Sequence, residues 1–205
     1  MIKSRIVVSL LGMLPMAAVM SIAEAPHPWL DQQLKKQRYP CPADNSPIRG
    51  PADAVVNVTE FGDYECPYCA KIEPTLRKVL EAYPTQVKLV YKNLPLAAIH
   101  PKAKEKALVA ECMGVQGKYW QAHDRMLAGA PPKKVTEGVD EGKLKACVSG
   151  GGEGQVDKDL ALAKRLGMAT TPGFVIDGIR IGGMLVFEQF KLLIDEELAR
   201  KSGTK

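Results

Sequence analysis

Two cysteines, separated by two residues, lie where a strand-like run of the sequence passes into a helical one. Residues 54–59 form an apolar, β-prone run, and residues 72–82 have the spacing of an amphipathic helix. Between them lies Cys66-Pro67-Tyr68-Cys69. Pro67 suits the first position of a helix, because its missing N–H would have no partner there. The sequence therefore predicts a strand, a turn and a helix whose first turn carries both thiols.

This position favours thiol chemistry at Cys66. The first N–H groups of a helix lack acceptors within the helix, and they place partial positive charge beside the first residues. Thiols in comparable positions ionise at roughly pH 3.5 to 7, well below an ordinary thiol. We therefore expect Cys66 to be the nucleophile or leaving group and Cys69, one turn further into the helix, to resolve the mixed disulfide.

Two other interpretations of the cysteine pair remain open. A zinc site would need further ligands at short spacing, but Cys41, Cys112, Cys147 and three histidines are scattered along the chain. The pair could also be an inert structural disulfide, although its place at a helix start speaks against that. We expect neither a metal nor an organic cofactor.

The motif resembles the redox site of the DsbA-like thiol–disulfide oxidoreductases of the thioredoxin superfamily. The resemblance rests on residues 50–69, on Pro74 and on the phrase at residues 116–120. It implies an α/β, thioredoxin-like fold with an inserted helical subdomain at about residues 97–167. Pro-Tyr replaces the Pro-His of the best-known oxidase, so the redox potential stays open.

The hydrophobic pattern fits such a fold. A strand is expected at 54–61, a helix at 72–82 and a second, parallel strand at 87–91. A region of about four helices follows, and then two strands joined by the turn signal Asp177-Gly178 and a terminal helix at 187–200. Residues 54–205 are thus expected to form the thioredoxin-like domain, preceded by a mostly irregular, proline-rich arm at 26–53.

The resemblance also assigns supporting residues. Thr171-Pro172 corresponds to a cis-proline dipeptide facing the cysteines, with a backbone that could pair with substrate; a trans proline at a strand edge is the alternative. Glu60 corresponds to a buried acid that could exchange the proton of Cys69, although a solvated glutamate at a strand end is also open. Tyr68 could tune the potential or contact substrate.

The sequence assigns no special role to the other polar residues considered. Asp63 and Glu65 are expected to face solvent, where their charge would slightly oppose a thiolate. His100 and His123 are interpreted as ordinary polar positions, since neither is close to the cysteines in sequence.

Residues 1–25 have the pattern of a secretory signal peptide, with Lys3 and Arg5 before an apolar stretch and small residues near its end. An uncleaved membrane anchor is the alternative. An exported protein can keep disulfides, so Cys112 and Cys147 are the candidates for a structural bridge. Cys41 is expected to stay unpaired.

The chain is therefore predicted to be an exported enzyme, periplasmic or otherwise extracytoplasmic, that forms disulfides through Cys66 and Cys69. Its expected partners are reduced or unfolded exported proteins and, as the family implies, a DsbB-like or VKOR-like membrane quinone oxidoreductase. A disulfide isomerase or reductase is the alternative, and a non-catalytic metal- or thiol-binding module a more distant one. The net charge of +5 comes without a basic cluster interleaved with aromatics, so nucleic-acid binding is not expected. We expect a monomer.

Overall fold

The computed structural model describes residues 27–150 and 153–203, so the predicted signal peptide at 1–25 lies outside the described residues. The described chain is organised around a five-stranded sheet with the strand order β1-β3-β2-β4-β5. The strands are β1 (Ile48–Arg49), β2 (Val56–Gly62), β3 (Val87–Asn93), β4 (Gly173–Ile176) and β5 (Ile179–Gly182).

The centre of the sheet is the predicted βαβ unit. β2 and β3 are parallel, with Val58 opposite Leu89, and α2 (Pro67–Ala82) connects them. β4 returns antiparallel to β2, and β5 pairs with β4 across Asp177-Gly178. Both turn residues have positive φ, 45° and 93°, which matches the hairpin expected from the sequence. This is the expected thioredoxin-like α/β fold.

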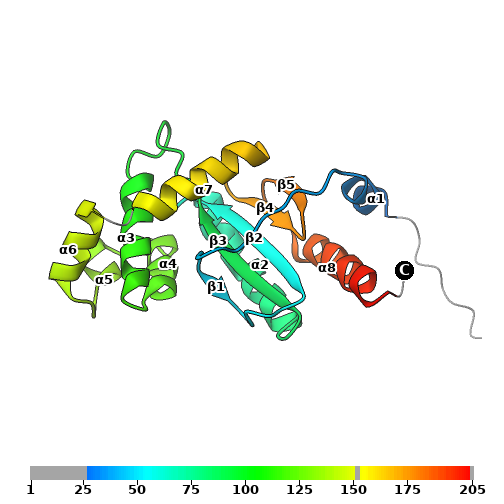
Figure 1. Cartoon of the computed structure of the whole chain (residues 1–205), viewed down its shortest axis with the longest axis horizontal. Helices are drawn as coiled ribbons and strands as arrows, with labels where there is room; N and C mark the ends of the chain where they lie inside the picture. Colours follow the sequence, from blue (N-terminus) through cyan, green and yellow to red (C-terminus); the bar gives the residue numbers. More distant parts are fainter. Residues whose placement is uncertain (1–26, 151–152, 204–205) are drawn as a thin grey trace, which may run out of the picture.

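Helices cover both faces of the sheet (Figure 1). α2 and α8 (Phe187–Ser202) pack on one face, where β2 contributes Val56 and Val58 to the largest core cluster. Phe61 and Val175 point to the other face and pack against α7 (Glu153–Leu166). The alternation of buried side chains along β2 and β4 thus divides the core between the two faces. None of the described helices is both long and apolar enough to cross a bilayer.

Apart from α7, the helices of the inserted region lie beside the sheet (Figure 1). Besides α7 this region contains α3 (Ala103–Val115), α4 (Tyr119–Leu127), α5 (Pro132–Val135) and α6 (Glu141–Gly150). These are five helices where about four were expected. The additional one is α5, a single turn that begins at Pro132.

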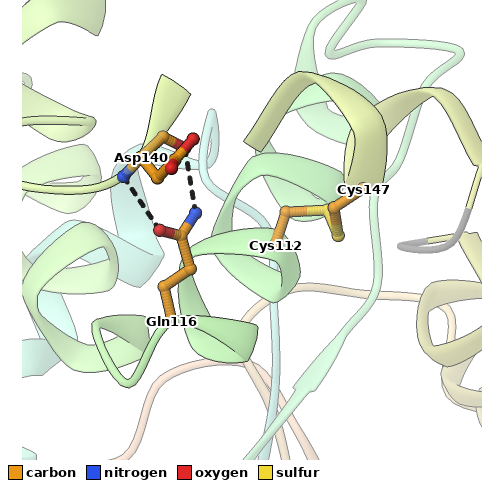
Figure 2. The surroundings of a disulfide bond; sticks show 4 residues. All are labelled: Cys112, Gln116, Asp140 and Cys147. Atoms are coloured by element: carbon orange, nitrogen blue, oxygen red, sulfur yellow. Dashed lines mark hydrogen bonds between the residues drawn. A yellow bond between two sulfur atoms is a disulfide. The ribbon is translucent and has the colours of Figure 1, made fainter. Parts of the chain in front are cut away.

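A disulfide between Cys112 and Cys147 joins α3 to α6, as the sequence suggested (Figure 2). Beside it, the Gln116 side chain exchanges two hydrogen bonds with the backbone of Asp140, just before α6, at 2.9 and 3.2 Å. α6 itself contains no buried residue. The disulfide and this amide pair therefore provide much of what holds α6 against α3.

The segment before residue 54 is more ordered than the expected irregular arm. α1 (Pro28–Leu34) packs Trp29 and Leu30 against the main core, and β1 pairs antiparallel with β3. The many prolines of the segment before residue 54 exclude a long helix but allow one short helix and a two-residue edge strand. Cys41 lies in this segment, half-buried and unpaired as expected.

Candidate active site

The two cysteines lie where the central strand of the sheet meets α2. β2 ends at Gly62, the chain turns over three residues, and Cys66 is the N-cap of α2, with Pro67 as the first helical residue. The Cys66 N–H donates to the carbonyl of Asp63 at 3.1 Å, which closes the turn. Because no side chain caps this helix end, the positive end of the helix dipole faces the Cys66 sulfur.

The two thiols differ in burial, and both are free in this structure. Cys66 is 5 % exposed and Cys69 is fully buried. Burial, followed by the charge of Glu60, raises the pKa of the Cys69 thiol far above its usual range. Cys69 is thus a poor nucleophile by itself and needs a group that takes its proton.

Thr171-Pro172 lies opposite the helix start. The peptide bond between the two residues is cis, and the carbonyl oxygen of Thr171 is 3.3 Å from the Cys66 sulfur, within reach of its S–H. The Pro172 carbonyl in turn accepts a hydrogen bond from the N–H of Gly183 at 2.9 Å. A loop that is distant in sequence is therefore fixed beside the sulfur, at the edge where an extended peptide could lie.

Glu60 lies in β2 and is fully buried. Neither of its carboxylate oxygens has a hydrogen-bond partner among the described residues. Burial, then the charge of Glu73 and then that of Cys66 raise the pKa of Glu60 well above its usual range. The interpretation of Glu60 as a solvated strand-end glutamate is therefore wrong, and the residue is a protonatable group inside the protein.

Asp63 does not face solvent, contrary to expectation. Its side chain is fully buried, accepts hydrogen bonds from the backbone N–H groups of Glu65 and Leu96, and lies 2.8 Å from the His100 ring nitrogen. Glu65 is also partly covered, because it accepts a hydrogen bond from the Lys102 N–H at 2.7 Å. The loop between β3 and α3 folds over the turn before Cys66, and Asp63 joins the two segments.

A second buried polar group was not predicted from the sequence. Glu73 of α2 and His123 of α4 are 3.1 Å apart, and the other nitrogen of His123 is 3.2 Å from the Tyr64 hydroxyl. His123 is fully buried and so is not the ordinary polar position we expected. One signal was present: Glu73 lies four residues after Cys69, on the same buried face of the helix.

These residues also form the one group among the described residues with the spacing of a metal site. Glu73, His123 and Asp124 each bring a ligand atom to within 4.8 Å of the others. However, the Asp124 carboxylate is already paired with the guanidinium groups of Arg49 and Arg77, at 2.9 and 3.1 Å. The cluster is thus an ionic network, and a cation would have to compete with two arginines for Asp124.

The chain is similar in sequence and in fold to known oxidoreductases. A family model described as thioredoxin matches residues 43–196. The structure of a thioredoxin-like oxidoreductase from Silicibacter pomeroyi is 28% identical, with a TM-score of 0.69 over 77% of this chain and 94% of that chain. DsbA2 from Pseudomonas aeruginosa is 26% identical, with a TM-score of 0.67 over 77% and 96%. BdbD from Bacillus subtilis shares the fold at 22% identity, with a TM-score of 0.68 over 79% and 96%.

Curated relatives match only with a small part of their length. An Na⁺/H⁺ antiporter NhaA from Salinispora tropica is 33% identical over 70% of this chain, but this is 23% of the antiporter. One from Salinispora arenicola is 44% identical over 43% of this chain and 14% of the antiporter. The similarity therefore concerns a minor part of each transporter.

Proposed function

We propose that this chain, which belongs to the thioredoxin family and is a DsbA-like thiol–disulfide oxidoreductase, works outside the cytoplasm and forms disulfides in other proteins. The observation that carries the proposal is the site at the start of α2. There a nearly buried Cys66 faces the carbonyl of Thr171 at 3.3 Å, while Cys69 lies behind it, fully buried. This arrangement suits an enzyme that accepts a substrate sulfur at one cysteine and shields the other.

The proposed reaction starts from the Cys66–Cys69 disulfide. A substrate thiolate attacks the Cys66 sulfur, a mixed disulfide forms, and the electron pair of the broken bond goes to the Cys69 sulfur. A second substrate thiolate then attacks the substrate sulfur of the mixed disulfide, which releases Cys66 as a thiolate. The substrate has lost two electrons and gained a disulfide, and the enzyme holds two reduced cysteines, the state in this structure.

Each supporting residue has a proposed task. The Thr171 backbone would pair with the extended substrate segment next to its cysteine, and Pro172 would hold that backbone in place. Glu60 would supply or accept the proton of Cys69. Tyr68, which is 54 % exposed directly beside Cys66, would contact apolar substrate side chains. A cavity of about 450 Å³ next to Glu65, with Val109 and Met126 in its wall, offers further apolar surface.

The proposed location and partners follow from the chemistry. The Cys112–Cys147 bridge is typical of proteins outside the cytoplasm, where disulfides persist. A periplasmic enzyme of this kind would act on reduced or unfolded exported proteins. It would need an electron acceptor to regain its disulfide, and we propose a quinone-linked membrane enzyme of the DsbB-like or VKOR-like class.

The oxidised enzyme mixed with a reduced, unfolded model protein that carries two thiols tests this function. We expect one substrate disulfide for each enzyme disulfide consumed, and none with the Cys66→Ser variant. The redox potential decides the direction: about −120 mV fits an oxidase, whereas about −270 mV, as in thioredoxin, would instead indicate the alternative reductase. Full exchange activity in the Cys66→Ser variant would overturn the proposal.

A further inference from the structure

The strongest unassigned feature of the molecule is a buried polar chain that leads from the redox site into the inserted helices. Glu73 is 7 % exposed, and its Oε1 atom is 3.1 Å from Nε2 of His123. Nδ1 of His123 is 3.2 Å from the Tyr64 hydroxyl, which is 3.0 Å from that of Tyr119. Tyr64 is itself two residues before Cys66, so this member of the chain lies beside the redox motif in the sequence.

One assignment of hydrogens satisfies this whole chain. If His123 donates from Nε2 to the Glu73 carboxylate, its Nδ1 can accept the hydrogen of the Tyr64 hydroxyl. The Tyr64 oxygen can then accept the hydrogen of the Tyr119 hydroxyl. We assign this arrangement because each buried donor then has an acceptor, and it leaves Glu73 as an anion bonded to a neutral imidazole.

The charged and titratable neighbours of Glu73 come from several elements. On α2, the Arg77 guanidinium lies 3.8 Å from the Glu73 Oε2 atom, and on α4 the Asp124 carboxylate is shared by Arg77 and Arg49 of β1. On β3, the Tyr91 ring lies 4.7 Å from that of His123, and the buried Tyr91 hydroxyl has no hydrogen-bond partner in the part of the chain that the structure describes.

On β2, Glu60 continues the alternation of Val56 and Val58, so it lies on the face of the sheet that is covered by α2, the helix that carries Glu73. The negative charge of Glu73 is the largest contribution after burial to the raised pKa of Glu60. Two carboxyl groups that share a poorly solvated space do not readily ionise together. Since Glu73 has hydrogen-bond and charge partners and Glu60 has no hydrogen-bond partner among the described residues, the proton belongs on Glu60.

We propose that Glu73, held by His123, is a positioning residue that keeps Glu60 protonated, so that Glu60 can give its proton to the Cys69 sulfur. This inference deepens the proposed function and rests on it. When a substrate thiolate attacks Cys66, the Cys66–Cys69 bond breaks and its electron pair goes to the Cys69 sulfur. The proton then passes from Glu60 to that sulfur, which leaves a Cys69 thiol and a Glu60 carboxylate.

Glu73→Gln is the sharpest test, because the amide keeps the shape and the contact with His123 but removes the charge. We expect the pKa of Glu60, followed by NMR of labelled glutamate carboxyls in the oxidised protein, to fall by about one unit, a tenfold change in its dissociation constant. Glu81→Gln, on the exposed side of the same helix, is the matched control and should leave it unchanged. A pKa of Glu60 that is the same in Glu73→Gln and in the unmodified protein would overturn the proposal.

The reaction gives a second readout. Protonated Glu60 is expected to speed the opening of the enzyme disulfide by a small thiolate. In Glu73→Gln this acceleration should disappear at a lower pH than in the unmodified protein. His123→Gln, which can still donate to Glu73, should keep more of the original pH profile than His123→Leu. Near-ultraviolet circular dichroism checks that each variant is folded, and identical pH profiles in folded variants would contradict the proposal.

The two proposals fail in different ways. If Cys66 and Cys69 do not exchange disulfides, the unmodified enzyme shows no reaction with thiols at all. If only the role of Glu73 is wrong, the unmodified enzyme reacts normally, and Glu73→Gln changes neither the pKa of Glu60 nor the pH profile.

Discussion

The sulfur of Cys66 lies 3.3 Å from the carbonyl oxygen of Thr171, although the two residues are 105 positions apart in the sequence. The contact joins the start of α2 to the loop before β4, and it places a peptide backbone directly beside the more accessible thiol. Cys69, in contrast, is fully buried behind it. The two thiols therefore differ in their access to a substrate, and Cys66 is the more accessible one.

Replacing the resolving cysteine should trap the substrate. In a Cys69→Ser variant, a mixed disulfide at Cys66 cannot be released by an internal thiol, so we expect it to accumulate with a disulfide-containing model protein. Non-reducing electrophoresis and mass mapping measure the adduct. Cys66→Ser is the control and should form no adduct, because the fully buried Cys69 cannot be reached. An adduct at Cys41 in either variant, or at Cys69 in Cys66→Ser, would contradict the proposed division of roles.

Glu60 should make the protein less stable as the pH rises. Its pKa is raised by burial, then by Glu73 and Cys66, so the folded state keeps a proton that the unfolded state loses above about pH 4.3. Stability from this group is therefore complete below that pH and is lost as the pH rises toward the folded-state pKa. Glu60→Gln removes this loss. The difference in free energy of unfolding between this variant and the unmodified protein should therefore grow by up to about 1.4 kcal/mol per pH unit.

Urea unfolding at several pH values measures this difference. The free energies of unfolding of Glu60→Gln and the unmodified protein should be similar near pH 4, at about the pKa of an unfolded glutamate, and diverge above it. Glu81→Gln, which changes an exposed glutamate, should run parallel to the unmodified protein. Parallel curves for Glu60→Gln as well would show that Glu60 is not held protonated by its surroundings.

The bridge between Cys112 and Cys147 should be structural rather than catalytic. Because α6 has no buried residue, we expect Cys147→Ser to lower stability by about 2–4 kcal/mol and to speed hydrogen exchange in residues 141–150. Thiol exchange by Cys66 should remain. Cys41→Ser, which removes an unpaired thiol, is the control for both measurements. Loss of exchange activity in a folded Cys147→Ser variant would assign this bridge a role in the chemistry.

Asp63 should be needed for the shape of the active-site turn. Asp63→Ala removes the acceptor of the Glu65 and Leu96 N–H groups, and each unsatisfied buried donor costs about 1–3 kcal/mol. We expect lower stability in urea and slower reaction of Cys66, whereas Asp53→Ala, at an exposed position, should change neither. An unchanged rate would mean that the turn keeps its shape without this carboxylate.

A buried ion pair between Lys92 and Asp159 was not predicted by the sequence, and it offers a further test of how the insertion is joined to the sheet. Both side chains are 1 % exposed, and their charged atoms are 3.4 Å apart. Lys92→Met should cost about 3–5 kcal/mol in urea unfolding, because it leaves a buried carboxylate uncompensated. The double variant Lys92→Met/Asp159→Leu should recover part of this loss; an equal or larger loss would show that the pair is not a coupled unit.

The parts of the fold that were predictable depend on local patterns. The strand, the Cys66-Pro67-Tyr68-Cys69 turn and the helix can be inferred because proline and apolar spacing act within a few residues. The Asp177-Gly178 hairpin is predictable for the same reason. The two-residue strand β1 was missed, since its order depends on pairing with β3 and not on its own sequence.

The site was predictable only in its covalent chemistry and its family motif. The burial of Asp63 depends on the loop at residues 94–100 folding over it, and nothing near Asp63 in sequence indicates that contact. Glu73 and His123 are 50 positions apart and meet only because α4 packs against α2. Polar residues of this kind look solvent-exposed in a sequence until their long-range partners are known.

The central claim, that Cys66 is the reactive thiol of the protein, is tested most directly by limited alkylation. The reduced protein is treated with a small amount of iodoacetamide at about pH 5, where ordinary thiols are almost fully protonated, and the label is located by mass spectrometry. Burial raises the pKa of both Cys41 and Cys69, so these thiols should react slowly. Label that appears first at Cys66, and faster than in an unfolded control, is the predicted result; equal labelling of all three thiols, or first labelling at Cys41, would contradict the account.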